Sequence, residues 1–142
     1  MTESKFIKTA RRVIREEARA LDVLADALDS TLSDAVDMIL NAKGRIIISG
    51  IGKSGHIARK IAATLASTGT PAHFVHPAEA SHGDLGMVTR EDVVLAISNS
   101  GEAPELANLI AYTQRFGIPV IGVTSKSDGA LATQSNIVLL IP

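Results

Sequence analysis

The hydrophobic residues near the N-terminus follow a helical period. They recur every seven positions, at Ile7, Ile14, Leu21 and Leu28. No glycine or proline interrupts this pattern before Gly44, so it predicts a long helix with one apolar stripe. Asp29 or Ser30 is suited to cap a second helix after the first. We therefore expect residues 1–43 to form a helical segment that packs on the domain following it.

The pattern changes after Gly44, where short apolar runs alternate with helical stretches. The runs predict strands at residues 45–48, 73–75, 93–97, 119–123 and 137–141. Helices are predicted between them, whereas residues 76–87 show no period. Continuous apolar strands joined by helices are typical of a parallel sheet covered on both faces. The sequence thus predicts an α/β fold, a doubly wound parallel sheet over residues 44–142, with an N-terminal helical arm.

Composition narrows the classes of function. The 142 residues carry 14 Lys+Arg against 15 Asp+Glu and only 3% aromatic residues. This balance offers no basic footprint for nucleic acid or an anionic membrane, and few aromatic rings for base stacking. The absence of cysteine excludes disulfides, thiol catalysis and cysteine-ligated zinc. The charged N-terminus and the lack of an apolar run of about 18 residues predict neither signal peptide nor membrane span, so we expect a soluble cytoplasmic protein.

Three loops at the predicted carboxyl ends of strands combine hydroxyl groups with glycine. They are residues 49–55 (SGIGKSG), 98–102 (SNSGE) and 124–129 (TSKSDG). Ligands of open α/β sheets bind at this edge. Glycine lets the backbone approach closely, hydroxyls and helix N-terminal N–H groups bind phosphate oxygens, and lysine adds positive charge. Several such loops on one edge favour a phosphorylated ligand over ordinary turn chemistry.

Two better-known phosphate motifs fit these residues poorly. Residues 50–55 spell G-x-G-x-x-G after a strand, but no acidic residue stands about 20 positions later to bind a ribose, and the first one there is Glu79. Residues 52–54 resemble the end of a P-loop, whose earlier glycine is replaced by Ile47. We therefore predict neither a dinucleotide site nor a P-loop.

Two sets of titratable residues are candidates for proton transfer. Within nine residues lie His76, Glu79, His82 and Asp84. Histidine titrates near neutrality, so His82 is a candidate proton-transfer group, while hydrogen bonds to the backbone explain such a loop equally well. A metal site would need these ligands to converge, which their spacing does not require, and we predict none. Glu102 and Glu105 open a helix, where they either favour its dipole or, beside a phosphosugar, abstract a carbon-bound proton.

Longer segments of the chain resemble one known family. The segments GIGKSGHIARKIAATLASTGTPAHFVHPAEASHGDLGMV and VVLAISNSGE are similar, in the same order, to the sugar isomerase (SIS) domain of D-arabinose 5-phosphate isomerases. The likeness runs from about Gly44 to Pro142. It implies an SIS-type, flavodoxin-like fold. It also implies interconversion of D-arabinose 5-phosphate and D-ribulose 5-phosphate through an enediol or enediolate, without an organic cofactor, supplying Kdo for lipopolysaccharide.

The same resemblance implies roles for individual residues. The family's phosphate-binding loops match Gly52, Ser54, Ser98, Asn99 and Ser100. Its catalytic pocket matches Lys53, His82 and Glu105. We expect Glu105 to act as the base, Lys53 to stabilise the oxyanion, and His82 to assist ring opening or proton transfer. Ala103 departs from the serine or threonine often found after S-x-S-G-E in SIS proteins, so one phosphate contact is expected to be missing.

The resemblance also implies partners and leaves alternatives open. We expect a phosphorylated pentose as ligand, and a homodimer or homotetramer formed through SIS packing. Family members continue beyond the matched region, commonly with CBS domains, so we expect the chain to be C-terminally incomplete and weakly active or inactive alone. One alternative is a non-catalytic phosphosugar sensor, although such sensors normally carry a helix-turn-helix ahead of the SIS domain. The other is an isomerase of a different phosphosugar.

Overall fold

The computed structural model describes residues 4–142, and this part of the chain divides into two compact units. The first unit ends at Asp29, and the second is Ser30–Ile141. Helix α1 (Lys5–Ala27) makes up most of the first unit, and none of its residues is buried. Its apolar stripe is therefore exposed, with side chains such as Ile7, Ile14 and Leu21. The packing of residues 1–43 on the following domain stays a prediction.

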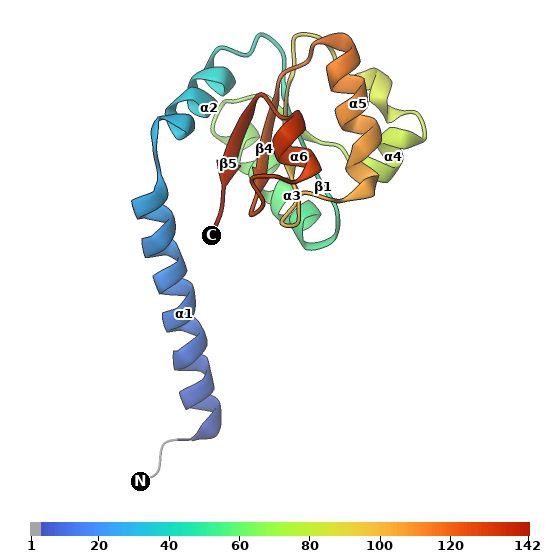
Figure 1. Ribbon diagram of the computed structural model, residues 1–142. Helices are drawn as coiled ribbons and strands as arrows, with labels where there is room; N and C mark the ends of the chain where they lie inside the picture. The colour runs from blue at the N-terminus through green and yellow to red at the C-terminus, as the bar shows by residue number, and fades with distance from the viewer. Residues whose placement is uncertain (1–3) are drawn as a thin grey trace. The chain divides into compact units, whose positions relative to one another are not determined.

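The second unit is built on one parallel sheet (Figure 1). In the described part of the chain its strands are β1 (Ile46–Gly50), β2 (Ala72–Phe74), β3 (Val93–Ile97), β4 (Val120–Thr124) and β5 (Ile137–Leu140). They lie in the order β2-β1-β3-β4-β5, and every neighbouring pair is parallel. Valine and isoleucine dominate β1, β3 and β4, as suits strands buried on both faces. The doubly wound parallel α/β sheet predicted from the sequence is confirmed.

Helices cover both faces of this sheet. Successive strand residues point to opposite faces, so each face has its own core. Ile47 packs in one core with Leu109, and Ile48 packs in the other with Ala35 and Ala58. The helices of the second unit are α2 (Ser30–Leu40), α3 (Gly52–Ser67), α4 (Pro77–Ser81), η1 (Asp84–Met87), η2 (Pro104–Leu106), α5 (Ala107–Phe116) and α6 (Ala130–Gln134).

Two of these helices, α4 and η1, fall in the segment that showed no period. His76 precedes α4, and its Nδ1 accepts a hydrogen bond from the N–H of Ala78 at 3.2 Å. Pro77 occupies the first helical position, where its fixed φ and missing N–H are tolerated. Five residues are too few to display a helical repeat, so local capping rather than periodicity defines α4.

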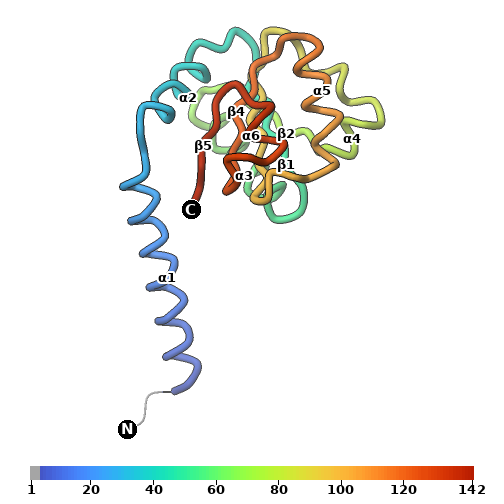
Figure 2. The backbone as a smooth tube through the Cα atoms, in the orientation of Figure 1, coloured from blue at the N-terminus to red at the C-terminus, as the bar shows by residue number. Residues whose placement is uncertain are grey.

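The carboxyl ends of the strands meet at one edge of the sheet. β1 and β3 pair as far as Gly50 and Ile97, and Ile97 pairs in turn with Val123 of β4. The turns after these strands gather at one end of the unit (Figure 2). The direction of winding reverses between β1 and β3, and doubly wound sheets bind ligands at such a switch point. The loops after β1 and β3 are therefore placed to form a site.

At the opposite edge, Asp92 ties the start of β3 to the start of β1. Its carboxylate is 2% exposed and accepts hydrogen bonds from the N–H groups of Arg45 (2.7 Å) and Thr89 (2.8 Å). The guanidinium of Arg45 lies 3.3 Å away. Burial alone would raise the pKa of Asp92, but the hydrogen bonds from Thr89 and Arg45 outweigh burial and lower the pKa below its ordinary value of 3.8. A Cβ at Gly44 would lie 2.5 Å from Asp92 Oδ1, so this anchor requires glycine there.

Replacing Asp92 with asparagine is expected to lower the free energy of unfolding by about 2 kcal/mol at neutral pH, because charged hydrogen bonds are lost. Since folding lowers the pKa of Asp92, its contribution is complete above pH 3.8 and is lost as the pH falls further. Urea unfolding at about pH 7 and about pH 3 measures both values. Glu91→Gln, at the exposed neighbouring carboxylate, is the control. A deficit for Asp92→Asn that is equal at the two pH values would contradict the role of its charge.

Candidate active site

The loop after β1 brings a helix N-terminus against the end of the strand. α3 begins at Gly52, whose φ of +57° favours glycine. A Cβ on Gly55 would lie 2.7 Å from the carbonyl oxygen of Gly50, so glycine allows the first turn of α3 to pack this closely. The N-cap residue makes no side-chain hydrogen bond to the helix. The first N–H groups of α3 are thus open to an anion, next to Lys53 and Ser54.

The loop after β3 carries the predicted serine and asparagine residues. Ser98 is only 5% exposed, and its N–H extends the hydrogen bonding of β3 to β4. Asn99 and Ser100 are exposed. The chain turns at Gly101, whose φ is +69° and whose N–H donates to the carbonyl of Ser98 at 3.1 Å. Ser100 Oγ accepts a hydrogen bond from the N–H of Glu102 at 3.2 Å, which orders the loop.

The carbonyl oxygen of Asn99 fastens this loop to the loop after β4. It accepts hydrogen bonds from the N–H (3.1 Å) and the hydroxyl (2.7 Å) of Ser125, and from the hydroxyl of Thr124 (3.3 Å). Thr124 is fully buried. A peptide group held by three donors has little freedom to rotate, so the two loops form one rigid surface.

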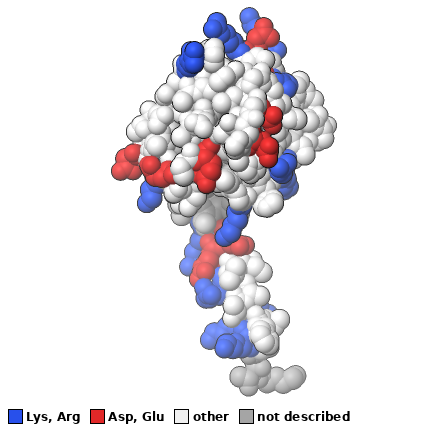
Figure 3. Space-filling model, turned by 90° about the vertical axis from the view of Figure 1, so that its right-hand side faces the viewer, with Lys and Arg blue, Asp and Glu red and all other residues white. Residues whose placement is uncertain are grey.

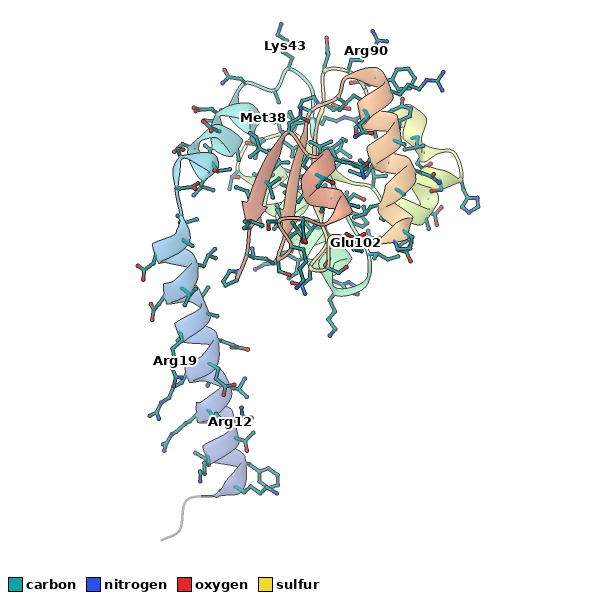
Figure 4. All side chains as sticks on the ribbon, viewed as in Figure 1. Arg12, Arg19, Met38, Lys43, Arg90 and Glu102 are labelled. Atoms are coloured by element: carbon teal, nitrogen blue, oxygen red, sulfur yellow. The ribbon has the colours of Figure 1, made fainter. Side chains whose placement is uncertain are left out.

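Glu102 makes a second link between the same loops. Its Oε1 accepts a hydrogen bond from the N–H of Ala130 at 2.8 Å, at the start of α6. Figure 4 shows Glu102 at the end of the unit opposite Lys43 and Arg90, which is the edge where the strands end. Sequence reasoning did not find this link. Of the two interpretations of a helix-opening glutamate, this contact favours the dipole for Glu102, but on α6 rather than on the helix it precedes.

His82 and Glu105 lie on neighbouring elements. His82 directly follows α4 and Glu105 belongs to η2, and both side chains are exposed. α4 packs against η2 and α5, and Asn108 Nδ2 of α5 donates to Ser81 Oγ at 3.0 Å. Lys53 lies on the other side of the switch point, after β1. Within residues 4–142 no hydrogen bond or ion pair joins these three predicted catalytic side chains, which stand on the segments following β2, β3 and β1.

The charges and ligand-forming groups of the described residues give further boundaries. On the face shown in Figure 3, basic and acidic side chains of the second unit are interspersed. Over residues 4–142, no three or more His, Cys, Asp or Glu side chains come together as a metal site. Nor does any helix in that range combine the length and the apolar character needed to cross a membrane.

Fold and site together define the class of protein. A doubly wound parallel sheet carries a helix N-terminus and a serine-rich loop on the two sides of its switch point, which is the arrangement of a domain that binds phosphate esters. The chain belongs to the SIS domain family, whose family model matches residues 38–142. The resemblance noted in the sequence is thereby confirmed.

Several relatives are close. The chain is 48% identical over 132 residues to the arabinose 5-phosphate isomerase KdsD of Pseudomonas aeruginosa, covering 93% of this chain and 40% of the relative. It is 47% identical over 135 residues to the arabinose 5-phosphate isomerase KpsF of Escherichia coli O6:H1, covering 94% and 41%. A solved structure of an E. coli CFT073 protein in complex with arabinose 5-phosphate matches all of this chain and 76% of that one, with a TM-score of 0.93 and 38% identity. The chain spans about two fifths of the length of the two curated relatives.

Proposed function

We propose that the chain is the phosphosugar-binding domain of an aldose–ketose isomerase that interconverts D-arabinose 5-phosphate and D-ribulose 5-phosphate. The observation that carries this proposal is the pair of loops at the switch point between β1 and β3. The names of the relatives support the substrate class. The domain boundary at residue 44 and the isomerase activity belong to the same proposal.

The phosphate group is anchored by both loops. The N–H groups of the first turn of α3, from Gly52 onward, face the negative charge together with the hydroxyl of Ser54. Across the switch point, the loop residues Ser98, Asn99 and Ser100 supply further donors. Because the Asn99 carbonyl already holds the β4 loop, these donors are positioned before the ligand arrives, which lowers the entropic cost of binding.

The isomerisation moves one proton between neighbouring carbons. In the aldose-to-ketose direction, Glu105 removes the proton from C2, next to the carbonyl carbon, and an enediolate forms. The ammonium group of Lys53 stabilises the negative oxygen of this intermediate. The proton returns to C1, which leaves the ketone at C2. His82 assists opening of the sugar ring or moves a proton between the oxygens.

The wider role follows from the same chemistry. Proton transfer of this kind needs no organic cofactor. The proposed product, D-arabinose 5-phosphate, would supply Kdo for lipopolysaccharide, and the proposed location is the cytoplasm. We propose a homodimer or homotetramer, which the exposed apolar stripe of α1 supports, because unpaired apolar faces of this length favour association.

Conversion of D-arabinose 5-phosphate to D-ribulose 5-phosphate by the purified protein tests the proposal. Formation of the ketose, with slower or no conversion of hexose phosphates, is the expected result. Tight binding of D-arabinose 5-phosphate without any conversion would favour the sensor alternative. Conversion of another phosphosugar in preference to the pentose would favour the second alternative.

Ala103→Ser is expected to raise the affinity for inorganic phosphate about threefold, because the hydroxyl adds the contact that this loop lacks relative to other SIS proteins. Ala103 is the N-cap residue of η2, a position that serine suits, so the fold is expected to tolerate the change. Titration calorimetry with inorganic phosphate measures the gain. Ala107→Ser, at an exposed position one turn later, is the matched control. Equal affinities for Ala103→Ser and the unaltered protein would show that this position does not face the phosphate.

A further inference from the structure

The ring of His76 is held in one protonation geometry by the start of α4. Its Nδ1 accepts a hydrogen bond from the N–H of Ala78 at 3.2 Å. A ring nitrogen that accepts a hydrogen bond carries no proton, so the proton of the neutral ring is on Nε2. His76 is therefore a hydrogen-bond donor at its far end as long as it caps α4.

This far end of the ring is free to bind a ligand. No side chain or carbonyl among residues 4–142 accepts a hydrogen bond from His76 Nε2. In the same range no buried side-chain nitrogen or oxygen lacks a partner, so Nε2 is in contact with solvent rather than enclosed. A fixed donor that reaches solvent beside a binding loop is available to a ligand at no cost in broken protein contacts.

His76 lies beside the loop that follows β1. The N–H of Val75 donates to the carbonyl of Ile48 at 3.0 Å, and Ser49 Oγ donates to the carbonyl of Val75 at 2.7 Å. The next residue, His76, is thus level with Gly50, where β1 ends. Neighbouring strands are about 4.8 Å apart, a distance shorter than a five-carbon sugar.

Aromatic contacts hold the ring in this position. Phe74 and His76 meet edge to face, with ring centres 6.3 Å apart and an angle of 74° between the planes. The guanidinium of Arg59 lies over the Phe74 ring at 4.0 Å. A methyl group placed on Gly55 would lie 3.9 Å from the same ring, so Phe74 packs beside the first turn of α3. The stack links His76 to the turn that carries Lys53 and Ser54.

We propose that His76 is a substrate-binding residue, which donates a hydrogen bond from Nε2 to a hydroxyl or carbonyl oxygen of the sugar whose phosphate lies on the loop after β1. This inference rests on the proposed function, since it takes the bound ligand to be a phosphosugar. A neutral N–H donor is suited to uncharged sugar oxygens, whereas the phosphate is held by the donors of the two loops. His76 thereby distinguishes the sugar part of the ligand from inorganic phosphate.

Two substitutions separate binding from capping. Asparagine at position 76 keeps an oxygen that accepts the Ala78 N–H, as N-cap residues do, but its side chain ends short of the position of Nε2. His76→Asn is expected to retain the thermal midpoint and to weaken binding of D-arabinose 5-phosphate by about 5- to 10-fold, with unchanged affinity for inorganic phosphate. His76→Ala is expected to lose sugar affinity equally and to lower the thermal midpoint as well.

Titration of the full chain with D-arabinose 5-phosphate and with inorganic phosphate distinguishes the outcomes. Sugar phosphate affinity of His76→Asn equal to that of the unaltered protein would leave His76 with a capping role alone. Equal loss of affinity for both ligands would place its effect on the phosphate loop and overturn the proposal. If the unaltered protein binds inorganic phosphate but not the sugar phosphate, the proposed function fails first, and this inference fails with it.

Discussion

Replacing Glu105 with glutamine is expected to slow isomerisation by about 10²- to 10⁴-fold, the range that loss of a general base produces. The amide keeps the size and hydrogen bonding of the side chain but cannot take up a proton. Glu105 is exposed in η2, at the end of the loop that binds the phosphate in our proposal. The rate of ketose formation from D-arabinose 5-phosphate measures the effect, and kcat is expected to fall while KM changes little.

The control for this substitution lies at the opposite edge of the sheet. Glu91 is equally exposed but precedes β3, on the side away from the proposed site. Glu91→Gln is expected to leave kcat unchanged. If Glu105→Gln turns over at the rate of the unaltered protein, Glu105 is not the base, and His82 becomes the remaining candidate among the residues that the resemblance assigns.

Gly55→Ala is expected to lower the free energy of unfolding by about 2–3 kcal/mol, although alanine is the better helix former by about 1 kcal/mol. The reason is steric. The added methyl group would lie 2.7 Å from the carbonyl oxygen of Gly50, and both groups belong to packed backbone that has little room to move. Relief of this clash requires the first turn of α3 to leave the end of β1. Affinity for inorganic phosphate is therefore expected to fall more than tenfold, which is about 1.4 kcal/mol.

Urea unfolding and phosphate titration check both parts of this result. Gly86→Ala is the matched control, because Gly86 has no atom within 4 Å of the added methyl group and no unusual φ. It is expected to change stability by less than about 0.5 kcal/mol. A Gly55→Ala variant as stable as Gly86→Ala would mean that α3 does not need its close approach to β1.

Much of the fold is readable from the sequence because the strands are long runs of β-branched residues. The strand predicted at residues 93–97 has those bounds in the structure, as β3. The strand predicted at 45–48 is β1, which runs on to Gly50 because Ser49 and Gly50 pair with β3. Such pairing depends on the neighbouring strand, so a polar serine and a glycine did not look like strand residues in isolation.

The candidate site was predictable in its residue types but not in its connections. Glycines and hydroxyl residues after strands point to phosphate chemistry whatever the neighbouring loops do. The links through the Asn99 carbonyl and through Glu102 join positions 26 and 28 residues apart and involve backbone groups that every residue carries. No pattern of side chains announces a partner for a carbonyl or an amide. The role of His76 depends on such an amide as well.

Exchange of the C2 proton of D-arabinose 5-phosphate with deuterium oxide tests the isomerase chemistry most directly, because it detects the enediolate even when little ketose accumulates. Proton NMR of the sugar phosphate, incubated with the protein in deuterium oxide, follows the C2–H signal. The proposed function predicts that this signal disappears at a rate proportional to protein concentration and at least 100-fold more slowly with Glu105→Gln, by about the lower limit for a general base. Saturated binding of the sugar phosphate with an undiminished C2–H signal would contradict catalysis by this domain.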